Sequence, residues 1–204
     1  MTNANPPAVD QNLISRVVGI LFKPRYEWPI IAAEQMTVNA IYTRYAMILA
    51  AIPALSSLIY NIASAHHTVV GALVIFVVGY ALTLFSVYIV ANVIEGLAHN
   101  FRSERNVRQS HKLAVYAMTP AWIAGILNIV GLDPFASLIG IYGFVLMYMG
   151  LEPLKQTPPD KRLMYTLSIV IVALLVNAGI WALMGAVMTS FAIEGAGPAA
   201  FALS

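Results

Sequence analysis

Long uncharged runs, separated by short charged segments, set the pattern of this chain. Residues 45–94 contain no Asp, Glu, Lys or Arg, and because one bilayer crossing takes ~20 residues, this run predicts two membrane-spanning helices. Residues 113–151 carry a single charge, Asp133, beside a Gly and a Pro that indicate a turn, so they predict two more. Residues 163–193 are uncharged and predict one tilted span. The predicted spans are about 45–65, 68–94, 113–131, 134–151 and 163–189.

The segment before the first span shows amphipathic helical spacing. Its apolar stripe consists of Leu13, Ile14, Val17, Val18 and Leu21. Its polar positions, which fall outside the stripe, are Asn12, Ser15, Arg16 and Lys23. Pro24 ends the helix, because proline disfavours the helical conformation in the residue before it. We expect residues 11–44 to form a cytoplasmic segment whose helix lies in the membrane interface. Packing of this helix on the protein's own cytoplasmic loops is the alternative.

Side chains suited to the membrane interface surround Pro24. The predicted interfacial anchors are Lys23, Arg25, Tyr26 and Trp28. The two ends of the chain differ from the rest in composition. We expect residues 1–10 to be disordered and residues 194–204, which contain two Gly and a Pro, to be a flexible tail beyond a transmembrane domain at 45–193.

Composition excludes an ordinary soluble protein. The 204 residues are 60% hydrophobic and 10% charged, whereas a typical soluble domain is ~45–50% apolar and ~25% charged. A soluble fold of this size has too little interior for so much apolar surface. The chain has no cysteine, which excludes disulfides and thiolate metal sites. The predicted fold class is an all-α polytopic membrane protein with five transmembrane helices and an N-terminal amphipathic interfacial helix.

The distribution of charge predicts an orientation. The net charge of +2 does not indicate nucleic-acid binding. All 11 Lys and Arg residues, however, fall before the first span or in the loops after the second and fourth spans. Because cytoplasmic loops carry the basic excess, we expect a multi-pass protein of the bacterial inner membrane with a cytoplasmic N-terminus and an external C-terminus.

Few polar groups fall within the predicted spans. The candidates for a polar membrane site are Asn92, Glu95, Asn128 and Asn177. The Glu95 carboxylate is either an ion or proton site or an interface residue paired with Arg102 or Arg105, and pairing is the reading we favour. Asn61, Asn128 and Asn177 are expected to bond across helices. Pro53 and Pro120 lie inside spans, where proline frees a backbone carbonyl, and they are predicted helix kinks.

Two further features suggest binding surfaces. Lipid headgroups or an acidic partner are the candidate ligands of the second basic loop, which contains Arg102, Arg105, Arg108 and Lys112. The alternative is that these residues only fix the orientation. Ala178, Ala182 and Ala186 form a small-residue ridge that suits either internal packing or a homo-oligomer. No motif typical of a catalytic or metal site is present, so we expect no enzymatic activity and no cofactor.

Four passages resemble the Yip1 family, and its bacterial branch in particular. They are LFKPRYEW at 21–28, GLAHNF at 96–101, AVYAMTP at 114–120 and IYGFVLMYMGLEPL at 141–154. The resemblance implies a five-span membrane protein and supplies no catalytic residues. Eukaryotic members associate with Rab GTPases, but this chain lacks their Asp-Leu-Tyr-Gly-Pro element, so that property is not implied here.

These observations favour a non-enzymatic inner-membrane protein that organises lipids or partners. The rival hypothesis is a small transporter, channel or lipid-moving protein, which the intramembrane prolines and Glu95 would suit.

Overall fold

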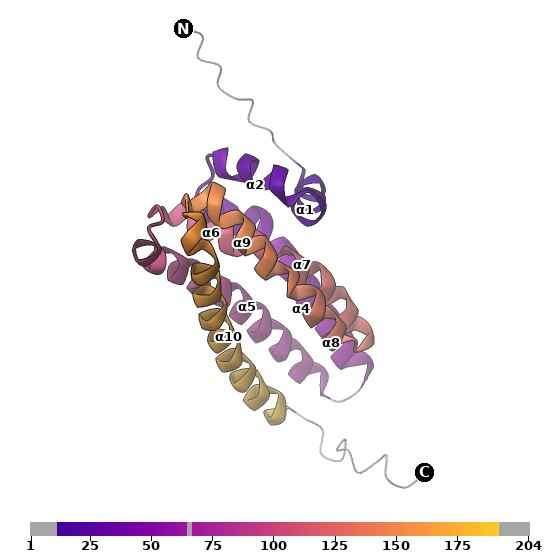
Figure 1. The fold of residues 1–204 in the computed structure, drawn as a ribbon. Coiled ribbons are helices and arrows are strands. Elements are labelled where there is room, and N and C mark those ends of the chain that lie inside the picture. The colour runs from indigo at the N-terminus through magenta and orange to yellow at the C-terminus, as the bar shows by residue number, and fades with distance from the viewer. Residues whose placement is uncertain (1–11, 65–66, 192–204) are drawn as a thin grey trace.

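The described part of the chain, residues 12–64 and 67–191 of the computed structural model, is helical almost throughout (Figure 1). The predicted disordered segment 1–10 and flexible tail 194–204 lie outside the described residues. The helices are α1 (Leu13–Phe22), α2 (Pro24–Ala33), α3 (Val38–Ile41), the π-helix η1 (Tyr42–Ala46), α4 (Met47–Ala63), α5 (Val69–Leu97), the 3-10 helix η2 (Ala98–Phe101), α6 (Val107–Ala117), α7 (Thr119–Ala124), the 3-10 helix η3 (Gly125–Val130), α8 (Asp133–Gly140), α9 (Tyr142–Lys155) and α10 (Pro159–Ser190).

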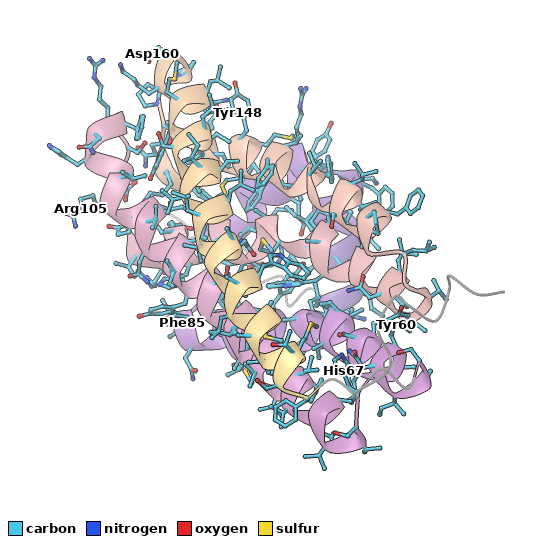
Figure 2. All side chains as sticks on the ribbon, turned by 90° about the horizontal axis from the view of Figure 1, so that it is seen from below. Tyr60, His67, Phe85, Arg105, Tyr148 and Asp160 are labelled. Atoms are coloured by element: carbon cyan, nitrogen blue, oxygen red, sulfur yellow. The ribbon has the colours of Figure 1, made fainter. Side chains whose placement is uncertain are left out.

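Five stretches of this structure are long and apolar enough to cross a membrane, which confirms the predicted number of spans. They are Val38–Ala63, Val69–Phe101, Val107–Val130, Pro134–Lys155 and Pro159–Ser190. The helices extend well past the uncharged runs that predicted them, mainly into the segments that carry the basic residues. Much of what the charge pattern indicated as loop is therefore the end of a helix. We call this end of the bundle, which holds Arg105 and Asp160, the basic end; Tyr60 and His67 lie at the opposite end (Figure 2).

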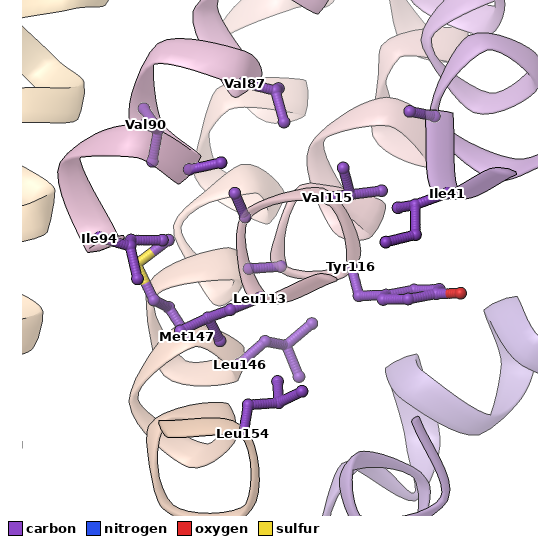
Figure 3. Packing of buried hydrophobic residues seen from close by; sticks show 14 of the residues in the cluster. Ile41, Val87, Val90, Ile94, Leu113, Val115, Tyr116, Leu146, Met147 and Leu154 are labelled. Atoms are coloured by element: carbon purple, nitrogen blue, oxygen red, sulfur yellow. The ribbon is translucent and has the colours of Figure 1, made fainter. Parts of the chain in front are cut away.

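The third span is the centre of the bundle. In its most apolar stretch 56% of the residues are buried, against 17% in α10. Leu113 of α6 lies close to Ile94 of α5 and Leu146 of α9, and all three side chains are fully buried (Figure 3). Tyr116 points to the other side of α6, where its ring contacts those of Tyr45 in η1 and Trp28 in α2. The fold thus surrounds one short buried helix with longer helices whose outer faces are apolar and exposed.

Pro120 interrupts this central span. It occupies the first turn of α7, where it cannot donate a hydrogen bond to the Tyr116 carbonyl. The Thr119 hydroxyl donates to that carbonyl instead, over 2.7 Å, and lies 2.8 Å from the Tyr45 hydroxyl of the first span. The break is therefore satisfied internally, as a membrane interior requires.

Pro53 behaves differently, since α4 continues through it to Ala63. It packs against η3, where a Cβ added to Gly125 would lie 2.4 Å from the Pro53 Cβ. Glycine at 125 therefore lets the first and third spans approach closely at this point.

Two short helices lie across the basic end (Figure 1). The Asn12 side chain caps α1 by accepting a hydrogen bond from the Ile14 backbone N–H, and Pro24 begins α2. Ile20 and Ile31 are completely buried beneath them. We call α1 and α2 the N-terminal pair. The predicted amphipathic helix is thus present, and one side of it packs on the bundle.

Candidate functional site

A buried polar cluster joins three helices at the basic end. Glu95 lies in the last turn of α5, and its Oε2 accepts hydrogen bonds from Lys155 Nζ (2.8 Å), Ser110 Oγ (2.9 Å) and the Asn106 backbone N–H (3.0 Å). Lys155 Nζ also donates to Ser110 Oγ over 2.9 Å. Lys155 and Ser110 are completely buried. We call these four residues the Glu95 cluster, and it connects α5, α6 and α9.

The structure gives Glu95 a different main partner from the expected one. We predicted pairing with Arg102 or Arg105. Arg105 Nε lies 3.6 Å from Glu95 Oε1, but its side chain is 70% exposed, whereas Lys155 is fully buried at 2.8 Å. Arg102 is exposed and ends η2 in the left-handed conformation, with φ of 53°. An exposed pair contributes little because water screens it, so Lys155 is the partner that matters.

The charged and hydroxyl groups of the Glu95 cluster bond to one another. A Ser–Lys pair acts as a nucleophile and base only when the lysine is neutral and the hydroxyl reaches a substrate. Here Lys155 Nζ and the Ser110 hydroxyl both donate hydrogen bonds to the Glu95 carboxylate. Ser110 is also inaccessible to solvent. The geometry therefore offers no free nucleophile at this position.

A second ionic group holds the N-terminal pair together. Arg16 Nη1 of α1 contacts Glu27 Oε1 of α2 at 2.5 Å, and Arg16 Nη2 contacts the Glu34 carboxylate just beyond α2. The prediction that Arg16 faces away from the packed side is wrong, because its side chain is only 6% exposed. Burial raises the pKa of the Glu27 carboxyl above its ordinary value, and the Arg16 guanidinium opposes that shift.

Lys112 attaches this pair to the third span. Its Nζ donates to the carbonyls of Ile31 (2.6 Å) and Glu34 (2.7 Å), which belong to the C-terminal end of α2. A cation is favourable there because the helix dipole places partial negative charge at that end. Lys112 is 1% exposed. Arg102, Arg105 and Arg108, the other predicted headgroup or partner contacts in this loop, are exposed.

The predicted interfacial anchors separate into two kinds. Lys23, Arg25 and Tyr26 are exposed, as an interfacial position requires. Trp28 is not an anchor, because it is 1% exposed and packs edge-on to Tyr116, with ring centroids 6.5 Å apart.

Large apolar side chains line the outer side of the N-terminal pair. They are Ile14, Val18, Phe22 and Tyr26, which are 49–77% exposed and recur every four residues. We call them the outer row. The sequence placed Ile14 and Val18 on the same stripe as Leu13, Val17 and Leu21, but the structure divides that stripe. The last three residues pack on the core, and the outer row faces away from it.

The other predicted polar residues do not gather with Glu95. Asn92 donates to the Tyr88 carbonyl of its own helix. Asn61 and Asn177 also donate within their own helices, to the carbonyls of Ser57 and Ala173, so these two do not form the expected bonds across helices. Asn128 lies in η3, and its buried Oδ1 has no hydrogen-bond partner among the described residues. The small-residue ridge of Ala178, Ala182 and Ala186 is exposed on α10.

Sequence reasoning missed Lys155, Ser110 and Glu34 as members of these clusters. Glu95 and Lys155 are 60 residues apart, and Lys112 is 81 residues from Ile31. Their contacts depend on which spans are neighbours, which uncharged runs do not reveal. The one available signal was that Ser110 and Lys155 each lie close to the end of an apolar run.

Five apolar helices with a polar, internally bonded end define an α-helical integral membrane protein that crosses the bilayer several times. The chain belongs to the Yip1 family, since the family model described as the Yip1 domain matches residues 18–193. It is 24% identical over 176 residues to the inner membrane protein YohC of Escherichia coli K12, covering 80% of this chain and 90% of the relative. The same values hold for YohC of E. coli O6:H1. No solved structure matches the chain significantly.

Removing Lys155 tests the Glu95 cluster. We expect Lys155→Met to lower the free energy of unfolding by ~3–5 kcal/mol, because the Glu95 carboxylate loses its buried partner. The double variant E95Q/K155M should recover much of that loss. Arg105→Ala is the exposed control and should change stability by less than ~1 kcal/mol. Thermal unfolding of the purified chain in detergent measures all three, and equal losses for K155M and R105A would contradict this assignment.

Proposed function

We propose that this protein is a non-enzymatic scaffold of the bacterial inner membrane that organises lipids or partner proteins at its basic end. The observation that carries the proposal is the outer row, an exposed apolar strip on a helix pair fixed to the bundle by buried charges. Its neighbours Lys23 and Arg25 are exposed cations. An apolar strip bordered by basic residues is the pattern of a segment that lies in the membrane interface.

The loop arginines add to this surface. Arg102, Arg105 and Arg108 are exposed at the basic end and are available to an anionic leaflet or an acidic partner. A basic residue near such a leaflet contributes ~1 kcal/mol. Apolar contact by the outer row and attraction by the arginines would act together in this arrangement, which supports lipid binding at this end.

The N-terminal pair presents the outer row in a fixed position. Arg16 connects α1 with α2 and the residue after it, Lys112 connects α2 with α6, and the Tyr142 hydroxyl donates to the Leu21 carbonyl over 3.1 Å. A surface held at this many points loses little conformational entropy when it contacts lipid. This rigidity is what favours a scaffold over a mobile arm.

Homo-oligomerisation through the ridge of Ala178, Ala182 and Ala186 remains part of the proposal. A Cβ added at Gly179 or Gly185, between these alanines, would meet nothing within 4 Å. This face of α10 is therefore open to close approach by another helix.

The contact of the outer row with lipid is directly measurable, because the chain has no native cysteine. In vesicles, an environment-sensitive fluorophore on Val18→Cys should show blue-shifted emission and quenching by acyl-chain quenchers. The control is Asp160→Cys, an exposed polar position at the same end, which should be quenched by aqueous iodide. Equal iodide quenching at both positions would contradict the proposal.

We further propose that the basic end faces the cytoplasm, because all 11 basic residues lie on that side of the five spans. Alkaline phosphatase fused after residue 204 should be active, and a green fluorescent protein fused there should be dark. The same reporters fused before residue 1 should behave in the opposite way. A fluorescent C-terminal fusion would overturn the orientation.

A small transporter or lipid-moving protein is the second candidate. The observation that favours it is the break in the third span at Thr119 and Pro120, since broken helices accompany substrate sites in transporters. Flux of protons, cations and labelled lipid into proteoliposomes tests it, with Glu95→Gln as the variant. The scaffold proposal expects no flux above empty vesicles from either protein, whereas flux that Glu95→Gln reduces would favour transport.

A further inference from the structure

Lys112 is a buried cation without a buried counter-ion. Its Nζ contacts two carbonyl oxygens, which are neutral, and the nearby Glu34 carboxylate is bound by Arg16. Among the ion pairs of the described residues none includes Lys112. Burying a charge without an opposite charge is costly. An ammonium has three N–H groups, so one remains for a further acceptor.

The surrounding charges do not balance. Arg16, Arg108 and Lys112 contribute three positive charges, and Glu27 and Glu34 contribute two negative ones. One positive charge is left over among these five side chains. A monoanion bound beside Lys112 would neutralise it.

A polar pocket lies at this position. It has a volume of about 60 Å³, and its lining comes from the turn after α2 and from the start of α6. The lining residues are Glu34, Gln35, Met36, Asn106, Arg108, Gln109 and Lys112. Because a cavity that holds one water molecule has a volume of roughly 10–15 Å³, the pocket has room for a tetrahedral oxyanion.

Two further features attract an anion to the pocket, namely the Arg108 guanidinium and the N-terminal end of α6. The Arg108 side chain is exposed at the pocket, where Nη1 makes only a long contact of 3.3 Å with Gln35 Oε1. Asn106 caps α6 and also lines the pocket, so the N-terminal end of that helix, which carries partial positive charge, lies beside it. The first and third spans begin nearby, at Val38 and Val107, so the pocket lies at the end of the bundle where two spans start.

We infer that this pocket binds a phosphate group, carried by an anionic phospholipid or present as free phosphate, with Lys112 as the inner ligand and Arg108 as the outer one. The inference rests on the proposed lipid-binding role of the basic end and names the chemistry that one part of it recognises. The bound phosphate supplies the missing negative charge. It also connects the start of α6 to the turn that follows α2.

Ligand-induced stabilisation of the full chain in a neutral maltoside detergent tests the inference. Dioctanoyl phosphatidylglycerol is titrated against dioctanoylglycerol, which lacks the phosphate, and sodium phosphate against sodium chloride at equal ionic strength. The dissociation constant follows from the rise of the unfolding temperature with ligand concentration. We expect phosphatidylglycerol to stabilise the protein and dioctanoylglycerol to have no effect. Stabilisation by inorganic phosphate as well would identify the free ion as a sufficient ligand.

Matched variants locate the site. Arg108→Gln should weaken binding about fivefold, the factor expected for one basic residue near an anionic surface, and Lys112→Gln should abolish it. Arg44→Gln, which changes an exposed arginine of η1 outside the pocket, should bind like the unmodified chain. Lys112→Gln removes hydrogen bonds that hold α2. If the Lys112→Gln variant does not fold, the affinity of Arg108→Gln decides whether the pocket is the binding site.

Two results would overturn the inference: no stabilisation by either phosphate compound, or equal binding by Arg108→Gln and Arg44→Gln. Neither result bears on the fluorescence of the Val18→Cys label. A water-exposed outer row, in contrast, would contradict the proposed function whatever the pocket binds. The two failures are therefore distinguishable.

Discussion

A charge withdrawn from water must find an opposite charge or a polar atom inside the protein, and this constraint determines how the helices meet at the basic end. Glu95 and Lys155 satisfy each other with Ser110 and thereby hold α5, α6 and α9 together. Arg16 does the same for α1 and α2. Because apolar side chains gain no hydrophobic drive from association within lipid, such polar contacts provide the specificity that packing alone lacks.

In the opposite half of the bundle, glycines let neighbouring helices approach each other closely. Gly125 admits Pro53 of the first span, and a Cβ added to Gly71 of α5 would lie 2.6 Å from the Phe191 Cβ, beyond the end of α10. Contacts of this kind depend on small residues and dispersion. Buried ion pairs and their hydrogen bonds thus join helices at the basic end, and close approach at Gly125 and Gly71 joins helices farther from it.

The sequence predicts the number of spans well because a bilayer crossing needs only length and apolarity, which uncharged runs record directly. It misplaces Arg16 and Trp28 because the pattern treats charged and amphipathic residues as surface groups. Burial of Arg16 depends on Glu27 and Glu34, and that of Trp28 on Tyr116, which belongs to a distant helix. Lys155 as the partner of Glu95 also requires knowing which helices are neighbours, so no local pattern contains it.

The contacts of Lys112 also set when the N-terminal pair can attach to the third span during synthesis. Its carbonyl partners Ile31 and Glu34 precede it by 81 and 78 residues. At ~5–20 residues per second, translation alone takes roughly 4–16 s to cover that separation. During this interval the N-terminal pair exists without its attachment to the third span, and its apolar faces are open. The nascent protein must therefore rest these helices on the membrane surface, or on a chaperone, until the third span arrives.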